Sequence, residues 1–359
     1  MHPGGDALQF GVAAHGADPP PALRLMEHPS RIGKYEVEEY LGGGMSRVYR
    51  AKDSVLGRRV ALKILGESAA SDPEAKTKFL QEARLASSIA HENIIAVYDF
   101  GEEDGRPFMV MEFLEGESLR EAIEKRRTGD FARRLQIALQ VGRAIGYIHL
   151  KKIIHRDIKP ENIHVDPLGR AKLMDFGIAK PDGVRLADTG FTVGTPYYMS
   201  PEQVLGQDVT NQADVYSFGV LLYELLTGKK PIEAENSEKI FHKILYDPLN
   251  LEPLQEAAVA PAVIDLVRKC MAKPPAERPR GFGIVCGAIE ETLRQGALQP
   301  RPAPAGTTAE PSFEDEMPPF LQGLPAPLRT LGGLAFLAGI ATLLAMAVIY
   351  FGLRLARVI

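Results

Sequence analysis

The chain has 359 residues, of which 45% are hydrophobic and 25% charged, so it is long and apolar enough for one large bilobal domain or two smaller ones. Its formal net charge of −4 excludes the broad basic surface that nucleic-acid-binding proteins use, and no nucleic-acid partner is expected. The two cysteines, Cys270 and Cys286, form no CxxC pair and no metal-type spacing with histidine. They are typical of buried thiols in a reducing compartment.

Residues 1–31 are rich in Gly, Ala and Pro and follow neither a helical nor a strand period. Such a segment buries too little apolar surface to offset its ordering entropy, so we expect a flexible N-terminal tail. The tail also lacks the positive start and the continuous apolar run of a secretory signal. We therefore expect the N-terminus to stay in the compartment where it is made.

The segment 32–296 has the patterns of a folded domain with two parts. Short apolar alternations predict antiparallel strands joined by Gly-rich and Asp-containing turns, and these alternations lie at 35–37, 47–49 and 60–62. Helix-type spacing over 74–90, preceded by Asp72 and Pro73, predicts one helix among the strands. Longer helical patterns follow at 132–149, 211–227 and 262–269. We therefore expect a small sheet lobe and a larger helical lobe.

The C-terminal part of the chain has the composition of a membrane anchor. Residues 297–329 contain repeated prolines, which favour extended segments, so we expect a juxtamembrane linker. Residues 330–353 are an apolar run without a charged residue, long enough to cross a hydrocarbon core of about 30 Å. No polar face interrupts this run, which favours a transmembrane helix over a buried one. Residues 354–359 would be a short extracytoplasmic tail.

Two segments near the N-terminus are suited to a nucleotide. The glycine-rich run 41–48 lies between two predicted strands, where glycines allow backbone N–H groups to approach a triphosphate closely. Taken alone, this run is more typical of an ordinary Gly-rich hairpin than of a nucleotide-binding loop. Lys63 ends the apolar strand that begins at Val60, where its ammonium is costly without an anion to meet.

The stretch 155–162 supplies three different needs of phosphoryl transfer. Asp157 could accept the proton of a substrate hydroxyl, Lys159 two residues on could place a cation beside a transferring phosphoryl group, and Asn162 five residues on could bind Mg²⁺. Asp175 follows an apolar strand, thirteen residues after Asn162. That separation suits a hairpin that returns the Asp175 carboxylate to the same metal ion.

These segments stand in one order along residues 35–293, and that order resembles the protein kinase family, especially the bacterial membrane-anchored, Hanks-type serine/threonine kinases. The resemblance implies an α+β, bilobal protein kinase fold, with a small antiparallel β-sheet lobe that holds one main helix and a larger α-helical lobe. One C-terminal transmembrane helix would follow. The implied activity is transfer of the ATP γ-phosphoryl group to Ser and Thr hydroxyls of proteins, with signalling from the membrane.

The resemblance also assigns roles to the matching residues. Asp157 would be the catalytic base, Lys159 the electrostatic stabiliser, and Asn162 and Asp175 the metal ligands. Lys63 would meet the ATP phosphates and pair with Glu82, Met111 would line the adenine pocket, and the backbone of two hinge residues would bond the base. The residues expected around ATP are Leu41, Gly42, Gly43, Gly44, Met45, Ser46, Val48, Ala61, Lys63, Glu82, Met111, Glu112 and Leu114.

The segment 177–200 carries three threonines in the region where the family has its activation loop. We expect autophosphorylation at Thr189 and Thr192, with Arg156 receiving a phosphothreonine through charge-assisted bonds. Thr195 would have a structural role near the substrate site. Plain surface threonines are the alternative for all three.

Three further residues are implied to be scaffold. By the same resemblance, Asp214 would bond the backbone of the catalytic stretch, and Arg278 would pair with Glu202 at the end of the threonine-bearing segment.

The implied cofactors are ATP and Mg²⁺, with Mn²⁺ as an alternative metal, and they require the kinase domain to be cytoplasmic. We expect a single-pass protein of the bacterial cell membrane that acts on Ser/Thr-containing proteins. Small residues at Ala335 and Gly339, and at Ala341 and Ala345, are compatible with a packed helix pair and hence a homodimer.

Two other functions remain open. The main one is a catalytically weak pseudokinase that serves as a membrane-tethered scaffold, favoured by a glycine-rich loop one residue shorter than the family pattern. A small-molecule phosphotransferase gives no reason for the threonine-bearing segment.

Overall fold

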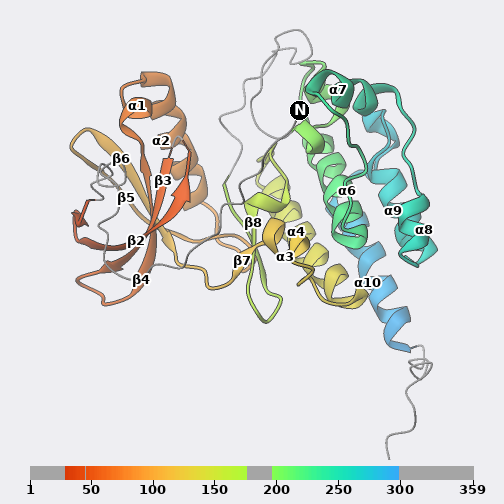
Figure 1. Ribbon diagram of the computed structural model, residues 1–359, viewed down its shortest axis with the longest axis horizontal. Coiled ribbons are helices and arrows are strands. Elements are labelled where there is room, and N and C mark those ends of the chain that lie inside the picture. The colour runs from red at the N-terminus through yellow and green to blue at the C-terminus, as the bar shows by residue number, and fades with distance from the viewer. Residues whose placement is uncertain (1–28, 45, 176–195, 299–359) are drawn as a thin grey trace, which may run out of the picture. The chain divides into compact units, whose positions relative to one another are not determined.

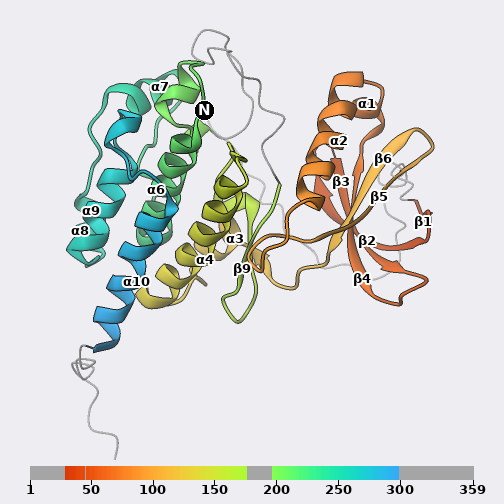
Figure 2. The same ribbon diagram turned by 180° about the vertical axis from the view of Figure 1, so that it is seen from behind.

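The computed structural model describes residues 29–44, 46–175 and 196–298. These residues belong to a unit that spans Met1–Leu298, and Gln299–Ile359 form a second unit. The first unit has two lobes, one built on a sheet and one built from helices (Figures 1 and 2).

The N-terminal lobe is built on an antiparallel sheet. The described residues form a 6-stranded sheet in the order β1-β2-β3-β4-β6-β5. Its strands are β1 (Arg31–Ile32), β2 (Tyr35–Gly43), β3 (Ser46–Asp53), β4 (Arg59–Leu65), β5 (Val97–Glu103) and β6 (Arg106–Glu112). Alternate side chains pack a core on one face, where Tyr49, Leu62 and Val110 are buried. The other face is left for helices.

Helices α1 (Glu67–Ala70) and α2 (Pro73–Ser87) pack with that other face. Asp72 caps α2, because its carboxylate accepts a hydrogen bond from the Glu74 N–H at 2.9 Å. Phe79 of α2 packs in one cluster with Met109 of β6. This packing holds α2 beside the strands and brings Glu82 within reach of β4.

The C-terminal lobe packs around α6 (Asn211–Thr227), in which every residue from Ala213 to Leu226 is buried. The other helices in the described part of this lobe are α3 (Leu119–Glu124), α4 (Phe131–Leu150), α5 (Pro201–Val204), α7 (Ser237–Tyr246), α8 (Glu252–Glu256), α9 (Pro261–Cys270) and α10 (Phe282–Leu298). Short 3-10 turns lie at Pro160–Asn162, Pro196–Tyr198 and Pro275–Glu277.

Helix α10 packs closely on α4 through glycines. A Cβ at Gly142 would lie 3.0 Å from Sγ of Cys286, and one at Gly146 would lie 3.1 Å from Cβ of Phe282, so the two helices run antiparallel. Cys286 and Cys270 are both free and buried, as expected. Burial raises the pKa of Cys270 to about 12, so this thiol stays protonated at neutral pH.

Three short strands form a second sheet that contacts the chain leading into β5. The strands β7 (Glu117–Ser118), β8 (Ile163–Val165) and β9 (Ala171–Leu173) form a sheet in that order. Leu173 exchanges backbone hydrogen bonds with the chain that leads into β5, donating to Asn93 O at 2.8 Å and accepting from the Ile95 N–H at 3.0 Å. The hairpin β8–β9 therefore lies directly beneath the N-terminal lobe.

The predicted bilobal kinase fold is confirmed. The helices expected over 74–90, 132–149, 211–227 and 262–269 are α2, α4, α6 and α9, and α2 ends three residues early, at Ser87. Helix α10 continues to Leu298, two residues past the predicted end of the domain. Within the described ranges no helix is long and apolar enough to span a membrane, and the predicted membrane helix 330–353 lies outside them.

Candidate functional site

Lys63 on β4 lies between two carboxylates. Its Nζ atom is 3.0 Å from Oε1 of Glu82 on α2 and 2.8 Å from Oδ1 of Asp175 after β9. The Lys63 side chain is only 12% exposed, so its charge depends on these partners. The predicted Lys63–Glu82 pair is present, and the same lysine joins the sheet lobe to the end of β9.

The three groups shift one another's pKa. Burial disfavours the Lys63 ammonium, but Asp175 and Glu82 outweigh burial and raise the pKa of Lys63. The Lys63 charge holds the pKa of Asp175 below its usual range. Burial raises the pKa of Glu82 despite the lysine. Lys63, Glu82 and Asp175 form a lysine cluster, which therefore contains a charged Lys63 and an ionised Asp175 at neutral pH.

The catalytic stretch brings Asp157, Lys159 and Asn162 together. Lys159 Nζ lies 2.8 Å from Oδ2 of Asp157. The Asn162 side-chain amide donates to the Asp157 backbone oxygen at 2.8 Å and to its Oδ2 at 2.9 Å. The 3-10 turn that begins at Pro160 folds the chain back so that these contacts form. The carboxylate is thus fixed in orientation by two neighbours.

Asp214 at the start of α6 holds the beginning of this stretch, as the resemblance implied. Its carboxylate accepts hydrogen bonds from the backbone N–H groups of His155 and Arg156, each at 2.8 Å, and contacts His149 Nε2 at 2.8 Å. Arg156 has a φ of +66°, a strained value for a non-glycine residue. The three contacts to Asp214, whose side chain is completely buried, stabilise that conformation.

Asp175 is placed next to Asn162 by the hairpin β8–β9. The Met174 N–H donates to the Asn162 backbone oxygen at 2.8 Å, so Asp175 follows directly after a residue bonded to the catalytic stretch. His155 reinforces this link through Nε2, 3.2 Å from the Met174 oxygen. The hairpin therefore returns the chain to the catalytic stretch immediately before Asp175.

The residues at this point fit a divalent cation. Asn162 uses its amide nitrogen for both bonds to Asp157, which leaves Oδ1 as the atom suited to a hard cation. Asp175 supplies an ionised carboxylate. In the described part of the chain, no three His, Cys, Asp or Glu side chains form a metal site by themselves. Mg²⁺ commonly takes one or two protein ligands together with substrate phosphates, so the small set is suitable.

The glycine-rich segment is the tip of the β2–β3 hairpin. Gly42 pairs with Val48 and Gly43 with Arg47, so only residues 44 and 45 separate the two strands. Gly43 has a φ of +131°, and a Cβ there would lie 2.0 Å from Ser46 O. Only glycine fits this position. Met45 lies outside the described residues.

Most residues predicted around ATP gather on one patch of the sheet. Val48 pairs with Lys63 across β3 and β4, and Ala61 pairs with Met111 across β4 and β6. Ala61 and Met111 are buried. The strand β6 then ends at Glu112, and Leu114 follows in the connection between the lobes. The patch leads directly from the lysine cluster to this hinge.

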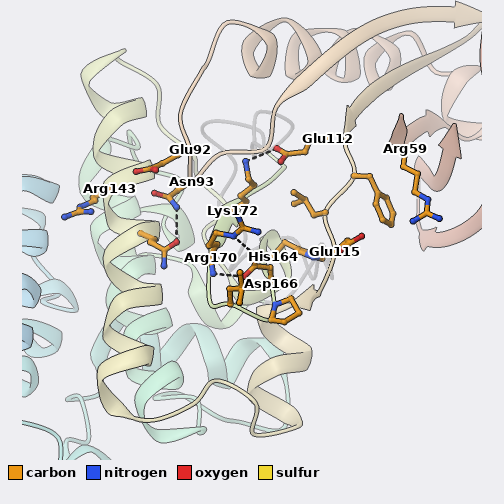
Figure 3. A pocket seen from close by; sticks show the side chains of 15 residues that line it. Arg59, Glu92, Asn93, Glu112, Glu115, Arg143, His164, Asp166, Arg170 and Lys172 are labelled. Carbon is orange, nitrogen blue, oxygen red and sulfur yellow. Dashed lines mark hydrogen bonds and ion pairs between the residues drawn. The ribbon is translucent and has the colours of Figure 1, made fainter. Parts of the chain in front are cut away.

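Lys172 is a hinge contact that the sequence reasoning missed. It extends from β9 to Glu112, with Nζ 2.8 Å from Oε2 (Figure 3). Both residues line a pocket of about 910 Å³ that also includes His164 and Leu114. Burial lowers the pKa of His164, which makes a hydrogen bond to the backbone of Glu115. Neither Lys63 nor Asp157 lines this pocket, so it is separate from the lysine cluster.

The segment after the threonines is anchored to the helical lobe. Arg278 forms a bidentate pair with Glu202 at 2.7 and 2.9 Å, as expected, and both side chains are buried. Gln203 Nε2 donates to the Arg156 backbone oxygen at 3.1 Å, which links α5 to the catalytic stretch. Thr189, Thr192 and Thr195 lie outside the described residues.

Comparisons with known proteins agree with the bilobal fold described above. Residues 35–289 match the protein kinase domain family. The serine/threonine-protein kinase PknA of Mycobacterium tuberculosis is 37% identical over 299 residues, covering 77% of this chain and 68% of PknA. The kinase PrkC of Bacillus subtilis is 39% identical over 248 residues, covering 68% of this chain and 38% of PrkC.

Another relative and a solved structure extend the comparison. The kinase pkn3 of Myxococcus xanthus is 37% identical over 286 residues, covering 75% of this chain and 52% of that protein. The crystal structure of Rad53 1–466 in complex with AMP-PNP has a TM-score of 0.61 and 24% identity, covering 72% of this chain and 65% of that one. The likeness to Rad53 supports the fold alone.

Proposed function

Since this chain belongs to the protein kinase family and is a serine/threonine protein kinase, we propose that the cluster of Lys63, Asp157, Asn162 and Asp175 carries its phosphoryl transfer, with Mg²⁺ as the metal. Asp157 accepts the proton of the substrate hydroxyl, and Lys159 stabilises the charge of the transferring group. Asn162 and Asp175 hold the metal, and Lys63 contacts the phosphates of ATP.

One observation carries this proposal: three separate parts of the chain, namely β4, the end of β9 and the catalytic stretch, are joined by direct contacts. Lys63 contacts Asp175 at 2.8 Å, and Met174 is bonded to Asn162, which in turn bonds Asp157. If Lys63 and Glu82 formed only a surface salt bridge, there would be no reason for the catalytic stretch and Asp175 to be joined to the same lysine. Bound Mg²⁺ supplies charge neutralisation for the phosphates, while these side chains supply orientation and the proton acceptor.

The nucleotide base is proposed to lie against the hinge. Ala61 and Met111 pair across β4 and β6 and are buried, which suits an apolar wall against the base, and the backbone of Glu112 and Leu114 would bond the base edge. The carboxylate of Glu112 is paired with Lys172, and the Glu112 backbone N–H donates to the Ala96 oxygen at 2.9 Å.

Regulation is proposed to act through the threonine-bearing segment. Thr189 and Thr192 would be the sites of autophosphorylation, Arg156 the receiver of a phosphothreonine, and Thr195 would have a structural role near the substrate site. The backbone N–H of Arg156 is bonded to Asp214 and its backbone oxygen to Gln203, so the position of its Cα is fixed. This supports Arg156 as the residue that binds a phosphothreonine.

The location proposed for the enzyme is the bacterial cell membrane. The uncharged apolar run 330–353 is the single-pass anchor, the kinase domain lies in the cytoplasm with its ATP, and small residues in the run pair two copies as a homodimer. Alkaline carbonate extraction of cell membranes tests the anchor. A full chain that is released like a chain ending at Leu298 would contradict it.

The catalytic role is tested by incubating the purified chain with labelled ATP and Mg²⁺, beside an Asp157→Asn variant. We expect phosphothreonine in the wild-type chain and a fall of about 10²–10⁴-fold in the variant, since a positioned general base contributes that much. Wild-type labelling no greater than that of the variant would favour the pseudokinase.

A further inference from the structure

Arg120 on α3 contacts three other segments of the helical lobe at once. Its Nε atom donates to Oε1 of Glu161 at 2.8 Å, and one terminal nitrogen donates to Oε1 of Glu224 on α6 at 2.6 Å. Its other terminal nitrogen donates to the hydroxyl of Tyr198, which also bonds Glu224. A guanidinium has a rigid fork of donors, so one side chain fixes three acceptors in relation to one another.

The contacts of Arg120 to Glu224 and Tyr198 are shielded from solvent, whereas the Glu161 side chain is 37% exposed. The Arg120 side chain is 15% exposed and that of Glu224 is 3% exposed. Tyr198 is also buried. The second carboxylate oxygen of Glu161, Oε2, is buried and has no hydrogen-bond partner among the described residues. Glu161 therefore depends on Arg120 for its pairing.

Each of the three acceptors belongs to a different functional part. Glu161 stands directly before Asn162, which bonds Asp157. Tyr198 ends the turn that follows the threonine-bearing segment, and its backbone oxygen accepts a hydrogen bond from Ser217 Oγ of α6 at 2.6 Å. Glu224 lies deep in α6. Arg120 thus connects the catalytic stretch, the turn Pro196–Tyr198 and helix α6.

Helix α6 then holds the catalytic stretch at both of its ends. Asp214 binds the beginning directly, through the backbone of His155 and Arg156. Glu224 binds the end indirectly, through Arg120 and Glu161. The two acidic residues are ten positions apart, which corresponds to about 15 Å along a helix at 1.5 Å per residue. A rigid helix therefore sets the spacing of the two attachment points.

We propose that Arg120 is a positioning residue for phosphoryl transfer: by bridging Glu161 to Glu224 and Tyr198, it fixes the end of the catalytic stretch, and with it Asn162 and Asp157, relative to the segment beside the protein substrate. Arg120 touches neither the nucleotide-binding lysine nor the hinge. Its loss therefore lowers kcat and raises KM for a protein substrate, while KM for ATP stays unchanged.

The test compares two conservative variants in the full chain. Arg120→Lys keeps the charge but has no fork, so it reaches fewer of the acceptors. Glu161→Gln keeps the shape of the catalytic stretch and removes only its charged pairing with Arg120. The matched control is Arg134→Lys, because Arg134 is also half-buried and also bridges to α6, donating to Leu226 O at 3.0 Å.

We expect kcat to fall about 10- to 100-fold in Arg120→Lys and less in Glu161→Gln, with KM for ATP within about twofold of wild type. The double variant is no worse than Arg120→Lys alone, because both changes break one bridge. Arg134→Lys keeps the wild-type kcat. Active sites are counted by nucleotide-binding stoichiometry, so an unfolded fraction does not lower the measured kcat.

Two outcomes would overturn the proposal. One is a kcat per active site within about twofold of wild type in both Arg120→Lys and Glu161→Gln. The other is a fall in Arg120→Lys that matches its loss of Tm and is repeated in Arg134→Lys, because that indicates a general structural role. An inactive wild-type chain would instead contradict the phosphotransfer role of Lys63, Asp157, Asn162 and Asp175. A failure of the Arg120 proposal can therefore be distinguished from a failure of the proposed function.

Discussion

The Nζ atom of Lys63 lies 2.8 Å from Oδ1 of Asp175, although 112 positions separate them in the chain. This contact joins the sheet lobe to the end of the hairpin β8–β9, and it places a cation beside the carboxylate proposed to hold the metal. A lysine with 12% of its side chain exposed needs such a partner, or the phosphates of ATP, to remain charged.

Replacing Lys63 by methionine is therefore expected to abolish tight nucleotide binding. Glu82 and Asp175 would then face one another without a cation, and the pKa of Glu82 would rise further. Titration with a fluorescent ATP analogue measures the effect. Lys76→Met is the control in the same lobe, since Lys76 pairs with Glu102 at 3.1 Å on the surface. Equal affinities for both variants would contradict a phosphate-binding role for Lys63.

Arg278 uses all of its donor positions in the native protein. Besides its two bonds to Glu202, it donates to the backbone oxygens of Gln212, Ala272 and Lys273, each at 2.8 Å. Arg278→Met leaves the buried Glu202 carboxylate uncompensated and is expected to lower the free energy of unfolding by about 3–5 kcal/mol.

Chemical denaturation measures this loss, and a surface pair supplies the comparison. Arg143 lies 2.8 Å from Glu290 with both side chains about half exposed, so Arg143→Met should cost no more than about 1 kcal/mol. A loss of similar size in the two variants would show that the burial of the Arg278 pair does not determine its contribution.

Gly43 and Gly44 are adjacent, but a side chain is excluded at only one of them. A Cβ at Gly43 would collide with the Ser46 backbone oxygen, whereas a Cβ at Gly44 would meet nothing within 4 Å. We expect Gly43→Ala to destabilise the hairpin tip by about 1–3 kcal/mol and raise KM for ATP, and Gly44→Ala to leave stability within about 0.5 kcal/mol. Matched steady-state kinetics and thermal melts decide between them; similar effects at both positions would contradict the geometry of the tip.

His155 links stability to pH. It is completely buried, and burial lowers its pKa below the usual 6.5. Its Nδ1 accepts a hydrogen bond from the Asp157 N–H at 3.3 Å, which a protonated Nδ1 cannot do. Below about pH 6.5 the unfolded chain binds a proton that the native chain refuses, so stability is full above that pH and is lost as the pH falls.

Melting temperatures between pH 7.5 and 5.5 measure this dependence. We expect the Tm of wild type to fall with pH more steeply than the Tm of His155→Gln, which has no group that titrates at this position. Identical slopes would assign the acid sensitivity to other histidines, of which His91 and His164 also have pKa values lowered by burial.

The chemistry of the site was predictable from sequence because its residues are close in the chain or spaced by a simple hairpin. Asp157 and Asn162 are five positions apart on one turn, and Asp175 returns on the next strand. Capping signals were equally readable, since Asp72 and Pro73 start α2 as expected. In each case a short-range rule of backbone geometry decides the outcome.

Long-range polar contacts were not predictable in this way. The Lys172–Glu112 pair and the bridge from Arg120 to Glu224 depend on tertiary packing, and neither leaves a periodic pattern in the sequence. Helix α10 was missed as well. Its glycines weaken the helix signal, although they do not prevent the helix; at Gly287, for example, even an added Cβ would meet no atom within 4 Å.

The burial of α6 on every side has a consequence for how this protein varies. A helix on a surface tolerates changes every three or four residues, where its outer face meets water. From Ala213 to Leu226 there is no such face, and polar positions such as Ser217 are occupied by internal bonds. A complete substitution scan should therefore find an unbroken block of intolerant positions here, and α7 should show the usual periodic tolerance. Sequence drift in this enzyme will collect around α6 and leave the helix itself almost unchanged.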